Sequence, residues 1–192
     1  MANVHSPGDH VTDANVALTY LKEGNERFLS GNPHKWDHKA AHDIVAKGQK
    51  PFAIVLNCAD SRTPPEIYFD QGLGNIFVIR NAGNFPDATA LGSIEFGVEH
   101  LKAALMVVVG HSKCGAVIAA QGGATGLSEN LQRAVDMIKV GVKDDPNADD
   151  AVGTNVDVCV DIIKNNPVIQ KFGTKVVGAI YDIATGEVKF KE

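Results

Sequence analysis

Four short apolar runs, rich in valine and isoleucine, punctuate the middle and the end of the chain. They cover residues 52–56, 75–79, 104–109 and 175–183, and glycine, proline or charged residues bound each run. Short runs that are apolar throughout are typical of parallel strands buried on both faces of a sheet. We therefore predict four strands of one sheet at these positions.

The segments between these runs have helical spacing of their apolar residues. They predict helices over residues 64–69, 89–101, 114–121, 129–142 and 148–165. The alternation of strands and helices predicts an α/β fold, with a central and mostly parallel β-sheet flanked by helices on both faces. The turn pair Thr185-Gly186 and the run 187–190 add one antiparallel strand at the C-terminal edge.

An amphipathic segment precedes the first strand. Residues 12–30 carry an approximate helical stripe, with Thr12 or Asp13 as the N-cap, and a second short helix is predicted over 37–47. We predict one domain over residues 1–192, in which 1–48 form an N-terminal helical arm and 49–192 the α/β core. The apolar stripe of the arm needs a cover, which a neighbouring subunit could supply.

Composition narrows the possible partners. The 192 residues are 44% hydrophobic and 21% charged, as expected for a folded domain, and the formal net charge of -5 leaves no basic stripe for nucleic acid. The N-terminus resembles no secretory signal and no run is long enough to span a membrane, so we expect a cytoplasmic protein. Three widely spaced cysteines suit metal binding or catalysis better than disulfides.

Three metal-binding side chains stand at strand ends. Cys58 directly follows the first predicted strand, His111 follows the third, and Cys114 opens the next helix. Carboxyl ends of neighbouring parallel strands meet in one crevice, and two thiolates with one imidazole suit zinc with a fourth position left open. The helix N-terminus is expected to lower the pKa of Cys114. The alternatives are ordinary core residues, or a structural zinc with Asp60 as the fourth ligand.

A carboxylate and a guanidinium follow Cys58 closely. Asp60 can bind the metal, as in a closed state, or it can accept a hydrogen bond from a metal-bound hydroxide, and Arg62 would decide between these by holding the carboxylate. We favour the second role for Asp60. Read without the neighbouring ligand, such a pair is more often a solvated ion pair.

The segments Cys58-Ala59-Asp60-Ser61-Arg62 and His111-Ser112-Lys113-Cys114 resemble the paired signatures of the β-class carbonic anhydrases, with a plant-like active-site pattern. The resemblance runs from about residue 14 to the last strand and includes segments 77–84 and 93–96. It implies one Zn²⁺ per subunit on Cys58, His111 and Cys114, with Asp60 and Arg62 as the catalytic dyad. It also implies a homodimer or a dimer-based tetramer in which some cleft residues come from the partner subunit.

The same resemblance implies a substrate cleft. Gln49 matches a hydrogen-bond donor to substrate, Phe77 and Ala82 match apolar lining positions, and Phe96 stands where plant-like members often have tyrosine. Val55 and Asn57 depart from the subgroup that carries a second, inhibitory bicarbonate site, so we do not expect that site. The departure also places the amide of Asn57 beside the metal.

The expected activity is the reversible hydration of carbon dioxide to bicarbonate and a proton by a metal-bound hydroxide. Two alternatives use the same zinc set: hydrolysis of carbonyl sulfide or carbon disulfide, and a non-catalytic, zinc-binding regulatory protein, against which the complete dyad argues. A further set of histidines, His34, His38 and His42, has i, i+4, i+8 spacing. We interpret it as a solvated face rather than a second metal site.

Overall fold

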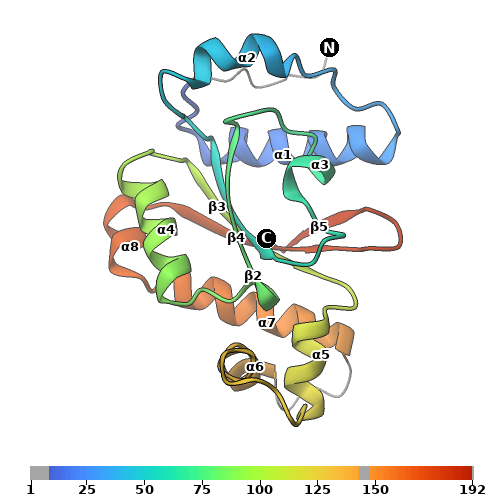
Figure 1. The fold of residues 1–192 in the computed structure, drawn as a ribbon. Helices are drawn as coiled ribbons and strands as arrows, with labels where there is room; N and C mark the ends of the chain where they lie inside the picture. Colours follow the sequence, from blue (N-terminus) through green and yellow to red (C-terminus); the bar gives the residue numbers. More distant parts are fainter. Residues whose placement is uncertain (1–8, 143–147, 192) are drawn as a thin grey trace.

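A five-stranded sheet organises the chain in the computed structural model, which describes residues 9–142 and 148–191 (Figure 1). The strand order is β2-β1-β3-β4-β5, and all pairs are parallel except β4 with β5. The bounds are β1 Ala53–Cys58, β2 Ile76–Asn81, β3 Leu105–His111, β4 Lys175–Tyr181 and β5 Val188–Lys191. The predicted fold class, including the antiparallel C-terminal edge strand, is confirmed.

Eight helices and one short 3₁₀ turn occupy the described residues. They are α1 Ala14–Leu29, α2 His38–Val45, α3 Pro65–Tyr68, the turn η1 Ala82–Asn84, α4 Ala88–Glu99, α5 Gly115–Gly122, α6 Glu129–Val142, α7 Ala148–Lys164 and α8 Pro167–Phe172. Across these same ranges, no helix combines the length and the apolarity needed to cross a membrane.

Helix α8 was not predicted. Its six residues are too short for a periodic pattern, but its two ends carry clear signals. The Asn166 side chain accepts hydrogen bonds from the backbone N–H groups of Val168 and Ile169, and proline at the first helical position is pre-set for a helix start. Gly173, with φ of 64°, ends the helix in the left-handed conformation that glycine adopts without strain.

The two faces of the sheet have separate apolar cores. Figure 1 shows α1 on one side of the sheet and α4, α7 and α8 on the other. Alternation along β1 sends Val55 into the core under α1 and α3, whereas Ile54 and Leu56 enter the core under α4, α7 and α8. Every residue of β1 and β3 is buried, which explains why both strands read as continuous apolar runs.

Helix α1 packs on the sheet of its own chain. The residues of its buried stripe are Ala17, Leu18 and Leu21. Asn25, also buried, donates hydrogen bonds from Nδ2 to the carbonyl oxygens of Tyr68 and Gly186 and accepts one at Oδ1 from the N–H of Val188. These residues enter the chain's own core, whereas Val16 and Leu29 of the predicted stripe are 41% and 45% exposed, so a cover from a neighbouring subunit stays a prediction.

Candidate metal centre

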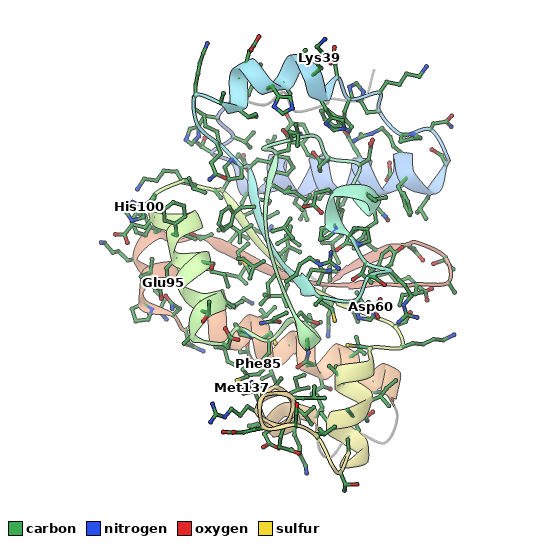
Figure 2. All side chains as sticks on the ribbon, viewed as in Figure 1. Lys39, Asp60, Phe85, Glu95, His100 and Met137 are labelled. Atoms are coloured by element: carbon green, nitrogen blue, oxygen red, sulfur yellow. The ribbon has the colours of Figure 1, made fainter. Side chains whose placement is uncertain are left out.

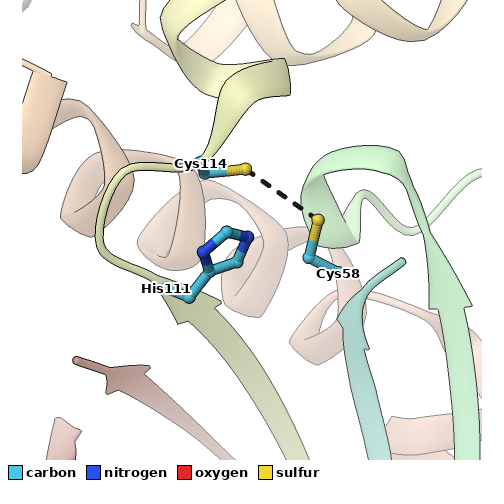
Figure 3. Close-up of side chains that lie close together, drawn as sticks. All are labelled: Cys58, His111 and Cys114. Atoms are coloured by element: carbon cyan, nitrogen blue, oxygen red, sulfur yellow. Dashed lines mark hydrogen bonds between the residues drawn. The ribbon is translucent and has the colours of Figure 1, made fainter. Parts of the chain in front are cut away.

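Cys58, His111 and Cys114 converge on one point at the carboxyl edge of the sheet (Figure 3). One ligand atom from each residue lies within 4.8 Å of the others, all three residues are buried, and the two sulfur atoms are 3.9 Å apart. Cys58 and His111 are the last residues of β1 and β3 rather than the first residues after them, and Cys114 is the N-cap of α5. Between the latter two, Lys113 turns the chain with a φ of 56°.

The imidazole of His111 is set up to bind a metal. Its Nδ1 atom lies 2.9 Å from the carbonyl oxygen of Ser112, which can only accept, so Nδ1 carries the proton and Nε2 the lone pair. Nε2 is buried and finds no hydrogen-bond partner among the described residues. A buried lone pair beside two cysteine sulfurs is costly unless a cation satisfies it. The donor set therefore fits Zn²⁺ with three protein ligands.

The two thiols share one negative charge when no metal is present. A hydrogen bond with Cys114 lowers the pKa of Cys58 to about 4, with further help from the N–H of Gly83, against the effect of burial. The pKa of Cys114 is raised instead, by the hydrogen bond to Cys58, by burial and by the charge on Cys58. The predicted lowering at Cys114 is thus wrong. The N–H groups at the start of α5 do act in that direction, but the neighbouring sulfur outweighs them.

Arg62 holds the carboxylate of Asp60 at both oxygens. The guanidinium donates from Nε to Oδ1 at 2.9 Å and from Nη2 to Oδ2 at 2.6 Å, and the Arg62 backbone N–H also reaches Oδ1 at 2.9 Å. These bonds hold the pKa of Asp60 well below its usual range. Oδ2 lies 3.9 Å from Nε2 of His111. The carboxylate is therefore a fixed anion beside the three candidate ligands.

Several supporting residues were not identified from the sequence. The N–H of Gly83 donates to the Cys58 sulfur at 3.4 Å, and Asn155 on α7 donates from Nδ2 to the carbonyl of Gly83 at 2.9 Å. Arg80 donates to the carbonyls of Cys58 and Asp60 at 3.0 and 2.6 Å. The available signal for Asn155 was a polar residue at an otherwise apolar position of a helix, where it is 1% exposed.

The predicted substrate residues do not gather at the cluster within one chain. Ala82 follows β2 directly, and its neighbour Asn81 pairs with Cys58, so Ala82 lies at the cluster end of the sheet. Phe77, however, is four residues before Asn81, about 13 Å away along the strand. Its ring lies 6.2 Å from that of Phe96.

Phe96 and Gln49 share the far end of the sheet with Phe77. The ring of Phe96 lies 5.2 Å from that of His100, and Figure 2 shows His100 at the left edge of the molecule and Asp60 in its right half. Gln49 is exposed and precedes β1. The substrate-binding roles of Gln49, Phe77, Ala82 and Phe96 stay predictions.

The remaining histidine and cysteine candidates lie elsewhere. Helix α2 begins at His38, so His34 lies outside it and the three spaced histidines do not share a helix face. The ring of His34 packs edge-on against that of Trp36, with 4.5 Å between the ring centroids. Cys159 is fully buried in α7, and burial raises its pKa to about 12. An inert thiol of this kind suits a core position.

Comparison with known proteins identifies the family. A family model described as carbonic anhydrase matches residues 53–188. Carbonic anhydrase 2 of Mycobacterium tuberculosis is 51% identical over 113 residues, which cover 57% of this chain and 53% of that protein. A carbonic anhydrase of Synechococcus elongatus is 32% identical over 180 residues, covering 79% and 64%. The chain thus spans about half the length of the first of these curated relatives.

Solved structures share the fold over nearly the whole chain. A tetrameric β-carbonic anhydrase of Sordaria macrospora superposes with a TM-score of 0.72 at 25% identity, covering 91% of this chain and 96% of that one. The β-carbonic anhydrase CcaA gives a TM-score of 0.73 at 25% identity, covering 91% and 95%. With a family match over most of its length and this structural likeness, the chain belongs to the carbonic anhydrase family, in its β class.

Proposed function

We propose that this protein catalyses the reversible hydration of carbon dioxide to bicarbonate and a proton, with Zn²⁺ held by Cys58, His111 and Cys114. The observation that carries the proposal is the convergence of these three buried side chains, with a His111 nitrogen that finds no partner among the described residues, beside an Asp60 fixed by Arg62. Membership of the carbonic anhydrase family supports the same reaction.

The chain's own groups have distinct tasks in this reaction. Zinc, when bound, supplies a Lewis acid that brings the pKa of a coordinated water toward neutrality. Asp60 stays anionic, and its carboxylate accepts a hydrogen bond from a group in the metal's fourth position, on the side that faces Nε2 of His111. Arg62 keeps both oxygens of the Asp60 carboxylate in one orientation, so that the carboxylate does not rotate to bind the metal.

The substrate cleft is proposed to form between two copies of the chain. Within one copy, Phe77 and Phe96 form an aromatic pair at the end of the sheet opposite the cluster, together with Gln49. These three residues can face a cluster only if it belongs to a second copy. Phe96 is 45% exposed, which is consistent with an apolar surface that another copy covers. The tetrameric state of the Sordaria macrospora relative supports an oligomer.

The test combines zinc analysis with stopped-flow carbon dioxide hydration. We expect one zinc per chain and rapid hydration by the wild-type protein, and loss of both in Cys58→Ser. The matched control is Cys159→Ser, a buried cysteine outside the cluster, which should keep both. The proposal is refuted if Cys58→Ser retains zinc and activity. Turnover of carbonyl sulfide or carbon disulfide without carbon dioxide hydration, or zinc without any turnover, would also overturn it.

A further inference from the structure

Asn57 is a fully buried polar residue directly before the candidate ligand Cys58, and the proposed reaction does not use it. The pleat of β1 turns the Cys58 side chain toward α5 and α7 and the Asn57 side chain toward the opposite face, where Val55 and Tyr68 lie in the apolar core. The expectation that this amide lies beside the metal is therefore wrong. An amide is costly in such surroundings unless its donors and acceptor are satisfied. The hydrogen-bond partners of the Asn57 amide therefore indicate its role.

The amide nitrogen of Asn57 bridges the loop that carries the dyad. Nδ2 donates to the carbonyl oxygen of Cys58 at 2.8 Å and to that of Thr63 at 2.7 Å, and it lies 3.1 Å from Oγ1 of Thr63. Residues 58 and 63 flank the segment that holds Asp60 and Arg62. One buried side chain thus ties together the two ends of this loop.

The hydroxyl of Tyr68 fixes the orientation of that amide. It donates to Oδ1 of Asn57 at 3.0 Å, so the nitrogen side must face the loop. Tyr68 is 1% exposed, and its ring stacks on Tyr181 with centroids 4.5 Å apart. Tyr181 pairs in register with His111, the last residue of β3. The tyrosine stack therefore lies beneath both strand ends that deliver candidate ligands.

Thr63, which accepts a hydrogen bond from the Asn57 amide, is itself hydrogen-bonded to Asp60. Its backbone N–H and its hydroxyl both donate to the carbonyl oxygen of Asp60, at 3.1 and 3.0 Å. Thr63 is itself fully buried, so the loop cannot shift without breaking these bonds. We propose that Asn57 and Tyr68 are positioning residues that act through Thr63 and hold the Asp60 carboxylate beside the metal centre. This inference rests on the proposed function of that centre.

Tyr68→Phe is the sharpest test, because it removes one hydroxyl and keeps the stacked ring. We expect it to retain zinc and a cooperative thermal transition, with kcat for hydration lowered about tenfold and KM changed less than twofold. The control is Tyr20→Phe, a tyrosine that borders the same core from α1 and should stay within twofold of wild type. Wild-type kcat in Tyr68→Phe would overturn the inference.

A second pair of variants separates the hydrogen bond from packing. Thr63→Val keeps the shape of the side chain and loses the hydroxyl, whereas Thr63→Ser keeps the hydroxyl. We expect Thr63→Val to fall in kcat as Tyr68→Phe does and Thr63→Ser to recover most of the wild-type value. Equal impairment of the two would show that packing matters at this position and would contradict a role through the hydroxyl.

Visible spectra of the Co²⁺-substituted proteins give a readout that does not depend on turnover. A displaced Asp60 alters the surroundings of the metal, so the cobalt bands of Tyr68→Phe and Thr63→Val should shift from those of wild type and Thr63→Ser at one pH. Superimposable spectra would overturn the inference. If the wild-type protein binds metal but does not hydrate carbon dioxide, the proposed function fails and these spectra alone decide whether the positioning holds.

Discussion

The Oδ2 atom of Asp60 lies 3.9 Å from the Nε2 atom of His111, the nitrogen that faces the two cysteine sulfurs. The carboxylate is held in this place from its other side, because Arg62 bonds both of its oxygens and is itself half exposed. Asp60 thus lies next to the three candidate ligands, and its binding to the metal in a closed state stays a prediction. In the proposed reaction, the charge of Asp60 acts on a group in the metal's fourth position.

Loss of Arg62 should therefore impair turnover more than metal binding. Arg62→Ala frees the carboxylate, and we expect kcat/KM for hydration to fall about 10- to 100-fold with zinc content unchanged. Arg62→Lys should recover little, because an ammonium group cannot reproduce the bidentate contact. Stopped-flow assays and metal analysis provide the measurements.

A matched control for this prediction is Arg133→Ala. Arg133 also bonds a carboxylate at 2.6 Å, that of Glu129, but on the exposed surface of α6. Exposed pairs of this kind contribute little, so its hydration rate should match that of wild type. Equal hydration rates for Arg62→Ala and Arg133→Ala would show that Arg62 has no role in the reaction.

The zinc-free protein should carry a thiolate at mildly acidic pH. With the pKa of Cys58 at about 4, its ultraviolet thiolate absorbance should appear as pH rises through that value and should be missing in Cys58→Ser. Cys159→Ser should keep the signal, since burial holds the pKa of Cys159 at about 12. No thiolate absorbance between pH 6 and 7 would contradict the assignment.

The same pKa sets the direction of a stability change. The pKa of Cys58 is lower in the folded chain than the value of about 8.5 for an ordinary thiol, so ionisation favours the fold. The stabilisation is fully present above the ordinary value and is lost as pH falls toward 4. Urea denaturation of the zinc-free protein should therefore show a decline over this window that Cys58→Ser lacks.

An added side chain at Gly83 should destabilise the fold. Its φ is 75°, and a methyl group there would overlap Cδ1 of Ile138, so we expect Gly83→Ala to lose about 1–3 kcal/mol of unfolding free energy. The shift of its N–H away from the Cys58 sulfur should also weaken zinc retention about tenfold in a chelator competition.

The control for Gly83 is Gly92→Ala in α4. An added methyl there meets no atom within 4 Å, and alanine favours a helix interior by up to about 1 kcal/mol. Denaturation curves of the two variants should move in opposite directions. Parallel shifts would show that the steric argument at Gly83 is wrong.

Residue identity at two strand ends and at the helix start that follows the second was enough to predict the three candidate ligands. Cys58 and His111 close β1 and β3, two neighbouring strands whose residues are all buried, so topology alone brings their side chains together. The positioning contacts could not be predicted in this way. Asn155 bonds Gly83 across 72 residues of sequence, and such a contact depends on how α7 lies against the sheet.

One expectation at the cluster failed because it treated a residue apart from its neighbours. The helix N-terminus was expected to lower the pKa of Cys114, but the sulfur of Cys58 reverses the direction. The deciding partner lies 56 residues away in the sequence.

Phe96 should control both assembly and turnover if the cleft forms between copies. Phe96→Glu places a charge on a half-exposed aromatic surface beside Phe77, and an unpaired carboxylate in an interface would oppose association. We expect sedimentation velocity to show a smaller species than wild type, with one zinc per chain and hydration lowered at least about tenfold. The control, Leu131→Glu, alters a side chain of the same 45% exposure on α6, where assembly should not change. A Phe96→Glu protein of wild-type size and activity would show that this aromatic pair lies outside the interface and that one copy completes its own cleft.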